Sequence, residues 1–182
     1  MYGYVKVGSA VPKLRVADCV YNKEEILKLV EAAAAKQVRV LSFPELSVTG
    51  YTCADLFFQT PLLHAAEQAI QEIAEATEAL NIFLLIGAPI AVDNQMFNCA
   101  VALYKGKLLG IVPKTHIPNY SEFYEERWFA SADDLLTEEI TYAGQNVPIG
   151  ADLIFAAADF PALKIGVEIC EDLWVPIPPV PI

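Results

Sequence analysis

The chain has 182 residues, of which 55% are hydrophobic, and this composition predicts one globular domain with a sizeable core. Its formal net charge of −11 argues against nucleic acid as a partner, because the 12 basic residues are scattered and form no basic patch. Charges and prolines interrupt every apolar run, so we expect no membrane partner and no membrane-spanning segment. The N-terminus lacks the basic and apolar regions of a signal peptide, which predicts a cytoplasmic protein.

The cysteines are widely spaced and include no CxxC pair. They are Cys19, Cys53, Cys99 and Cys170. Because no histidines neighbour them and no signal peptide is recognisable, this spacing predicts neither a zinc site nor a disulfide framework. We therefore expect reduced thiols and no metal centre.

The start of the chain has the pattern of a βαβ unit. Residues 2–10 and 38–43 have strand patterns, and the second of these strands ends at a proline. Between them a helix is expected to open at Asn22, with Glu25 three residues on at the spacing of a capping box. Such a unit predicts an α/β fold with a largely parallel central sheet covered by helices.

The next segment adds a helix and antiparallel strands. Residues 60–80 have apolar positions at helical spacing, and Thr-Pro at their start is typical of a helix N-terminus. A buried strand is predicted over 82–87. Strand patterns over 97–104 and 107–112 flank the turn signal Lys105–Gly106, which predicts a hairpin. The sheet is therefore expected to be mixed.

The last third of the chain is less regular. Residues 113–150 form a long aromatic and charged segment, and loops of this length in compact domains are usually functional or mobile. Strands are predicted over 152–157 and 163–169. We expect one domain over 1–175 and an extended, proline-rich tail over 176–182. An α/β domain that stops just after a strand-to-helix turn is expected to be truncated.

Two of the predicted strand ends carry charged residues that could act in catalysis. Glu45 follows a proline at the end of a buried strand, where a partly desolvated carboxylate has a raised pKa and can act as a general base. A salt-bridged loop acid is an equally good interpretation. Lys114 follows the hairpin strand and could stabilise a developing negative oxygen, or it could be a solvated lysine. His116 has no orienting acid and is expected to be structural.

The third strand end delivers Cys170 in front of two acids, Glu171 and Asp172, which are typical of the first turn of a helix. Unpaired backbone N–H groups at such a point lower the pKa of a thiol and could hold an oxyanion. The alternative is that Cys170 is a small buried hydrophobe. If Glu45, Lys114 and Cys170 converge, they provide a base, an electrostatic stabiliser and a nucleophile without metal or cofactor.

Three blocks of the sequence resemble the signature blocks of the nitrilase superfamily, the carbon–nitrogen hydrolases, and they occur in the family's order. They are Phe43-Pro-Glu-Leu followed by Gly50-Tyr51, Pro113-Lys-Thr-His-Ile-Pro-Asn-Tyr120, and Gly166-Val-Glu-Ile-Cys-Glu-Asp-Leu-Trp174. Within the superfamily, further runs look like the glutaminase domain of glutamine-dependent NAD synthetases. These runs are Gly50–Phe57, Asn119–Phe129 and Cys170–Trp174. The resemblance covers nearly the whole chain.

The resemblance implies an αββα sandwich with mixed sheets, incomplete at its C-terminus, and a cysteine mechanism on glutamine. Glu45 would deprotonate Cys170, whose thiolate attacks the side-chain amide, while Lys114 and the backbone N–H of Glu171 hold the oxyanion. Hydrolysis of the thioester would then release glutamate. Glu122 would support the lysine. The residues expected to contact the substrate are Tyr51, Tyr120 and Glu171.

The resemblance also implies partners and cofactors. Glutamine would be the substrate, and a synthetase domain would use the ammonia. The glutaminase reaction would need no cofactor, whereas ATP and Mg would belong to the synthetase domain. The sequence contains no Ser-Gly-Gly and no GxxxxGK[ST] phosphate loop, so we expect that domain to be absent from this chain. We also expect a homo-oligomer.

Other interpretations stay open. The chain could be a nitrilase-superfamily amidase that acts on another small aliphatic amide. It could also be a non-catalytic fragment, whose exposed sheet edge and apolar surface would favour pairing with another chain or aggregation. A third possibility is that Cys170 is a redox sensor, although no other cysteine is marked as its resolving partner.

Overall fold

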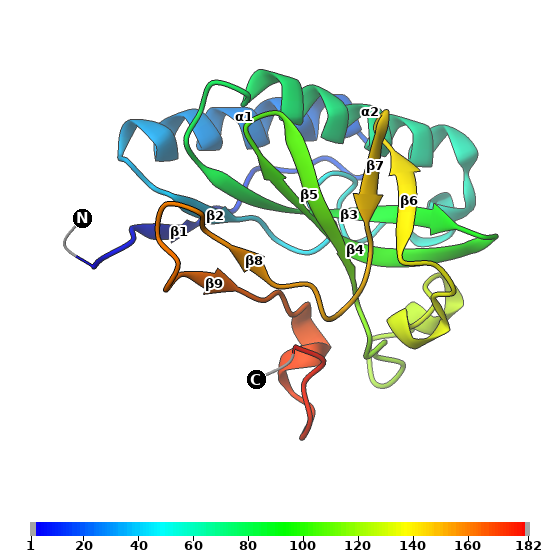
Figure 1. Ribbon diagram of the computed structural model, residues 1–182. Helices are drawn as coiled ribbons and strands as arrows, with labels where there is room; N and C mark the ends of the chain where they lie inside the picture. The colour runs from blue at the N-terminus through cyan, green and yellow to red at the C-terminus, as the bar shows by residue number, and fades with distance from the viewer. Residues whose placement is uncertain (1–2, 181–182) are drawn as a thin grey trace.

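A five-stranded mixed sheet carries two helices on one of its faces (Figure 1) in the computed structural model, which describes residues 3–180. The first three strands pair in parallel, and the fourth is antiparallel to both of its neighbours. The α/β class with a mixed sheet is thus confirmed. In spatial order the strands are β1 (Val7–Ser9), β2 (Val40–Ser42), β3 (Phe83–Val92), β4 (Gln95–Tyr104) and β5 (Lys107–Pro113).

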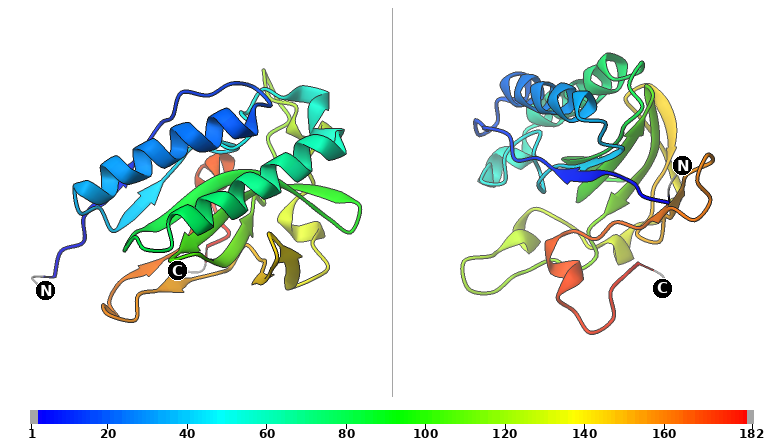
Figure 2. Two further views of the ribbon diagram at one scale, coloured as in Figure 1. Left: turned by 90° about the horizontal axis from the view of Figure 1, so that it is seen from above. Right: turned by 90° about the vertical axis from the view of Figure 1, so that its left-hand side faces the viewer.

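Helices α1 (Cys19–Ala35) and α2 (Thr60–Ala76) lie side by side over the sheet (Figure 2). Each turns an apolar stripe towards the core, and Ile26 of α1 and Ile70 of α2 are completely buried. Burying such a side chain stabilises the fold by about 1.5–3 kcal/mol. The sheet face under the helices is therefore the main hydrophobic core.

The start of α1 differs from the prediction. Its N-cap is Asp18, whose side chain accepts a hydrogen bond from the N–H of Tyr21. Asn22, the predicted cap, lies inside the helix and is buried. Its side chain instead bonds both the N–H and the C=O of Arg15 and the C=O of Val48, so it ties the loops around the helix together. The side chain of Asn22, which local spacing assigned to a helix cap, therefore makes tertiary hydrogen bonds instead.

Two hairpins occur that the sequence pattern did not predict. One joins β3 to β4 through Asp93–Asn94, where both residues have positive φ. The other joins β6 (Glu139–Tyr142) to β7 (Gln145–Pro148) inside the long segment that follows β5. The predicted hairpin turn at Lys105–Gly106 is confirmed, with φ of 49° and 77°. Residues 3–180 also contain four 3₁₀ helices: η1 (Ala54–Phe58), η2 (Glu125–Arg127), η3 (Ala132–Asp134) and η4 (Cys170–Leu173).

The face of the sheet opposite the helices is covered by the end of the chain (Figure 2). Strands β8 (Phe155–Ala156) and β9 (Lys164–Ile165) form a separate antiparallel pair, shorter than the strands expected there. After β9 the chain runs on to η4, near the loop that follows β5 (Figure 1). All four cysteines lie in the described part of the chain and are free. Between residues 3 and 180, no helix combines the length and the apolar character that crossing a membrane requires.

Candidate active site

Glu45 lies in the turn that follows β2, at the edge of the sheet where the parallel strands end. The turn rests on β3, because the N–H of Phe43 donates to the C=O of Leu85 at 2.9 Å and that of Val48 to the C=O of Gly87 at 3.1 Å. A Cβ added at Gly87 would lie 2.8 Å from the carbonyl carbon of Glu45, and closer still to the backbone of both adjacent residues. A glycine at this point is what allows the acidic turn to lie directly on the sheet.

Lys114 lies at the same edge of the sheet, at the end of strand β5. Strand β5 runs parallel to β3, because both are antiparallel to β4, and Lys114 is the residue after β5. Its N–H donates to the C=O of Asn98 at 2.8 Å, which extends the β4–β5 ladder by one residue. The side chain is completely buried. Its ammonium lies 2.7 Å from Oε1 of Glu45 and 2.9 Å from Oε2 of Glu125.

The two carboxylates offset the cost of burying the lysine charge. Burial alone would lower the pKa of Lys114, but the attraction of Glu45 and Glu125 outweighs it and raises that pKa. Desolvation raises the pKa of Glu45, and the nearby lysine charge opposes this only in part. Lys114 is therefore a permanent cation at neutral pH. Glu45 takes up a proton more readily than an exposed glutamate does, which suits a general base.

Two further polar residues, not singled out from the sequence, complete this cluster. Glu125, the first residue of η2, is only 1% exposed, and besides binding Lys114 it accepts a hydrogen bond of 2.6 Å from the hydroxyl of Tyr51. Asn98 of β4 is also buried, and its amide donates to Oε1 of Glu45. Lys114 and Glu45 are thus each bound by more than one polar side chain.

Glu122 does not take the supporting position predicted for it. It is exposed, and within residues 3–180 no hydrogen bond or ion pair connects it to Lys114. Glu125 makes that contact instead, since the η2 turn carries it inward together with Phe129, whose N–H donates to the C=O of Glu125. Glu125 could have been found from the sequence because the large apolar residue Phe129 follows it by four positions, the spacing of residues on one helical face.

Cys170 begins η4 with φ of 49°, in the left-handed region that non-glycine residues seldom adopt. It is exposed, whereas the other three cysteines are buried. The preceding residues Val167 and Ile169 are held against Ala100 and Val112 of β4 and β5. The strained conformation thus lies at the point where the chain leaves the sheet and turns its thiol outward.

The thiol lies close enough to Glu45 and Lys114 to feel both charges, but its pKa differs from the prediction. Partial desolvation and the negative charge of Glu45 raise the pKa of Cys170, and Lys114 lowers it by less. The expected lowering by a helix start was wrong, because η4 has only four residues and lies next to several carboxylates. These surroundings therefore favour the neutral thiol over the thiolate.

The residues predicted to contact substrate lie in two places. Tyr51 is half-buried, and its hydroxyl donates to Glu125 within the charged cluster. Tyr120 is 55% exposed, and its hydroxyl donates to both carboxylate oxygens of Glu171 at 3.0 and 2.9 Å. A cavity of about 1040 Å³ opens beside this second pair, and its walls also include Trp128. Among the described residues that line it, Glu45, Lys114 and Cys170 are missing, so the cavity adjoins the reactive groups and does not contain them.

The arrangement suits covalent acyl transfer. A thiol with a raised pKa lies within electrostatic range of a carboxylate that can take its proton and of a lysine that remains charged. Nowhere in the part of the chain that the structure describes do three or more histidine, cysteine, aspartate or glutamate side chains gather in a way that could hold a metal ion.

Comparison with known proteins shows what the whole chain is similar to. The carbon–nitrogen hydrolase family model matches residues 6–181. The glutamine-dependent NAD(+) synthetase of Mycobacterium leprae is 38% identical over 177 residues, which are 97% of this chain and 26% of that protein. The enzyme of the same name from Rattus norvegicus is 32% identical, over 92% of this chain and 25% of its own length. The chain thus spans about a quarter of the length of these relatives.

Solved structures show the same likeness. A glutamine-dependent NAD(+) synthetase from Cytophaga hutchinsonii matches with a TM-score of 0.83 and 30% identity, over 92% of this chain and 28% of that one. An amidase from Nesterenkonia sp. AN1 matches with a TM-score of 0.71 over 95% of this chain and 60% of that one. At 16% identity, the amidase supports the fold alone. The chain belongs to the carbon–nitrogen hydrolase family.

Proposed function

We propose that this chain hydrolyses the side-chain amide of glutamine and supplies the ammonia for NAD synthesis. The proposal is supported by the names of the relatives that match nearly the whole chain. The observation that carries the chemistry is the buried ammonium of Lys114, which lies between the carboxylates of Glu45 and Glu125 close to the thiol of Cys170. These groups suffice for a thioester mechanism.

In the first half of the reaction, Glu45 accepts the proton of the Cys170 thiol, and the sulfur attacks the amide carbon of the substrate. The negative charge that develops on oxygen is stabilised by Lys114 and by the N–H of Glu171. The hydrogen bonds of residues 3–180 include no acceptor for this N–H, which leaves it free for the substrate. Glu45 then gives its proton to the leaving nitrogen, so ammonia departs and a glutamyl thioester remains.

In the second half, Glu45 removes a proton from water, and the resulting hydroxide attacks the thioester carbonyl. The same two donors hold the oxyanion. When the carbon–sulfur bond breaks, glutamate leaves, and the proton on Glu45 returns to the Cys170 sulfur. The raised pKa values of Glu45 and Cys170 fit this exchange, because both groups bind a proton more readily than their ordinary counterparts.

Substrate recognition is assigned to the exposed end of the site. The carboxylate of Glu171 and the hydroxyl of Tyr120 would bind the α-ammonium group of glutamine, since both offer oxygen acceptors beside Cys170. Tyr51 would act through Glu125, which orients Lys114. The supporting role first assigned to Glu122 passes in this proposal to Glu125.

The wider biological setting follows from the same proposal. A synthetase domain would receive the ammonia, and ATP and Mg would bind there. The division into a domain over 1–175 and a tail over 176–182, the cytoplasmic location and the homo-oligomeric state stay predictions. Size-exclusion chromatography with light scattering would test the last of these.

Turnover of glutamine compared with that of small aliphatic amides tests the proposal. We expect glutamine to be hydrolysed faster than acetamide or propionamide, and Cys170→Ala to abolish both activities. Faster turnover of the aliphatic amides would favour the amidase alternative. A folded protein that hydrolyses none of these substrates would favour a non-catalytic role.

A further inference from the structure

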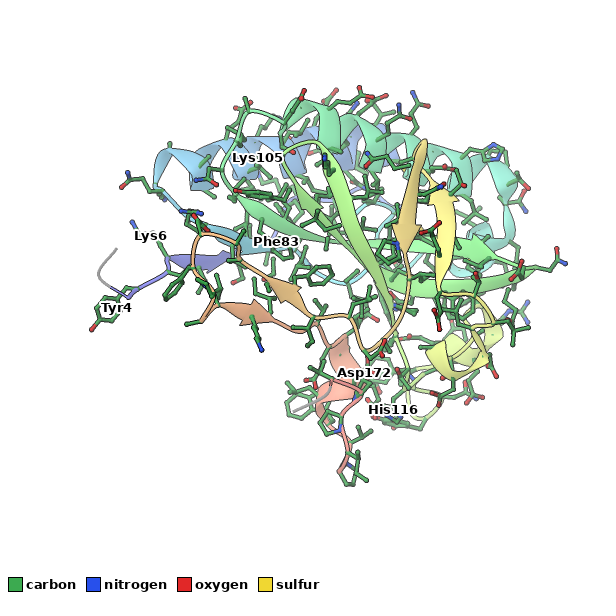
Figure 3. The ribbon with its side chains drawn as sticks, in the orientation of Figure 1. Tyr4, Lys6, Phe83, Lys105, His116 and Asp172 are labelled. Carbon is green, nitrogen blue, oxygen red and sulfur yellow. The ribbon has the colours of Figure 1, made fainter. Side chains whose placement is uncertain are left out.

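Asp172 is a buried carboxylate that the mechanism above does not use. It lies two residues after Cys170 in η4 and is 2% exposed. Its Oδ1 accepts hydrogen bonds from the N–H groups of His116 at 2.8 Å and Thr115 at 3.2 Å, and its Oδ2 accepts one from Ile169 at 3.2 Å. Figure 3 shows Asp172 next to His116, where the loop after β5 meets the end of the chain. Within residues 3–180 no cation pairs with it.

The three donors belong to the two segments that carry the reactive groups. Thr115 and His116 directly follow Lys114, and Ile169 directly precedes Cys170. The backbone N–H of Asp172 also donates to the C=O of Ile169 at 3.2 Å. Asp172 therefore binds both the N–H and the C=O of the residue that precedes Cys170. One side chain therefore connects two segments that are more than fifty residues apart in sequence.

Asp172 is the acceptor that the loop after Lys114 depends on. The carbonyl groups of this loop are bound elsewhere, because that of Lys114 accepts from the N–H of Ala132 at 3.0 Å and that of Thr115 from the hydroxyl of Ser131 at 2.6 Å. For the N–H groups of Thr115 and His116, the hydrogen bonds of the described residues include no acceptor other than Asp172. Backbone donors without a partner are costly when buried, so the loop follows the position of this carboxylate.

We propose that Asp172 is a positioning residue for catalysis, which sets the distance between the two groups that hold the oxyanion. One of these, the ammonium of Lys114, lies on the first segment, and the other, the N–H of Glu171, lies on the second. Among the described residues, the only other side-chain hydrogen bonds between the segments are those of Tyr120 with Glu171, at the exposed edge. This inference rests on the proposed mechanism, in which both donors contact the same oxygen.

The proposal separates two reactions of the same thiol. Alkylation of Cys170 by iodoacetamide displaces iodide from carbon and develops no oxyanion, so it depends on the thiol and its base alone. Acylation of Cys170 by an amide or an ester passes through a tetrahedral oxyanion and needs both donors. A residue that only stabilises the fold affects the two reactions together, whereas a residue that aligns the oxyanion donors affects acylation alone.

The experiment compares wild type with Asp172→Asn, which has the same shape but replaces one acceptor oxygen by an NH₂ group. We expect acylation by glutamine and by p-nitrophenyl acetate to fall about 100-fold, the order of effect of misplacing a catalytic group by about 1 Å. Alkylation by iodoacetamide should keep its rate within about threefold and its pH profile. Stopped-flow absorbance follows the ester, and intact-mass measurement follows the other two reagents.

Two further variants distinguish position from charge. Glu168→Gln removes a negative charge two residues before Cys170 on a side chain that makes no hydrogen bond within the described residues, and it should acylate like wild type. Asp172→Glu keeps the charge but reaches one methylene further. It should lose acylation while alkylation persists, and it provides a second test if Asp172→Asn does not fold.

Equal losses of acylation and alkylation in the folded Asp172 variants, or no loss of either, would overturn the assignment. Full acylation in Asp172→Glu would also overturn it, because charge alone would then be sufficient. Failure of the proposed function gives a different result: wild type would be alkylated and would accept the acyl group of the ester but not that of glutamine, and Asp172→Asn would still lose the ester reaction. A wild-type thiol that is alkylated but accepts neither acyl group would contradict both.

Discussion

The half of the site that carries the charges and the half that carries the thiol are held in contrasting ways. Glu45 and Lys114 lie at the end of a continuous sheet, fixed by backbone ladders and by the close approach to Gly87. Cys170 follows a two-residue strand, and a small apolar cluster and Asp172 hold its segment. The lysine is completely buried, whereas the thiol is exposed.

The difference follows from what each half must do. A buried ammonium and its two carboxylates are tolerated only when their geometry is well defined, and a packed sheet supplies that geometry. In the proposed mechanism Cys170 must admit a substrate and change its bonding twice, so it needs access more than burial. Changes in the charged half should therefore affect both stability and activity, whereas a change of the exposed thiol itself should affect activity alone.

The largest combined effect is expected from Lys114→Met. The substitution leaves Glu45 and Glu125 buried without their cation, and breaking a buried pair in this way costs about 3–5 kcal/mol. Urea unfolding should show this loss, together with loss of amide hydrolysis. Cys170→Ala is the matched control: it should abolish hydrolysis while the free energy of unfolding changes by less than about 1 kcal/mol. Equal stabilities of the two variants would refute the contrast between the two halves.

A smaller effect on stability is expected from Gly87→Ala. The new Cβ would lie within 2.8 Å of backbone atoms in the Glu45 turn, which cannot rotate away as a side chain can. Overpacking of this kind costs about 1–3 kcal/mol, and the displaced base should also lower the rate of hydrolysis.

Gly8→Ala serves as the comparison for this substitution, because its Cβ would find its nearest neighbour, the side chain of Leu41, at 3.4 Å, which is an ordinary van der Waals contact. Unfolding and activity measured on both variants should show a clear loss only at position 87. Normal activity in Gly87→Ala would mean that the acidic turn need not lie on the sheet.

The smallest effect concerns the pH dependence of thiol reactivity. Because desolvation and Glu45 raise the pKa of Cys170, its alkylation by iodoacetamide should still accelerate above pH 9.0, the ordinary value for a thiol. A midpoint below 9.0 in wild type would instead indicate a thiol activated by its own surroundings.

Strand periodicity was enough to predict much of the charged half. Glu45 and Lys114 each follow an apolar run, and the rule that ligands gather at strand ends indicated that they would meet, as their distance of 2.7 Å shows. Asn98 was not predictable in the same way. Asn98 reaches the site because it lies opposite Lys114 across the β4–β5 ladder. The register of the two strands determines this position, and the local sequence pattern does not reveal it.

Residues outside the sheet were harder to assign. The family resemblance indicated Glu122, but the η2 turn and the burial of Phe129 select Glu125. Asp172 was interpreted as a helix-start acid, and only the tertiary structure reveals that it binds the loop beyond β5. The thiol pKa was expected to fall because the helix was considered without the carboxylates that surround it. For Asp172 and for the thiol, the deciding contacts join distant parts of the chain.

Covalent labelling of Cys170 by an electrophilic glutamine analogue tests the central claim most directly, namely that Glu45 activates Cys170 for attack on glutamine. The rate of mass increase of the intact protein would be followed for wild type, Glu45→Gln and Cys170→Ala, with peptide mapping of the product. The account predicts one adduct, located on Cys170, which forms much more slowly in Glu45→Gln and does not form in Cys170→Ala. A folded wild-type protein without an adduct on Cys170, or equal rates in wild type and Glu45→Gln, would contradict it.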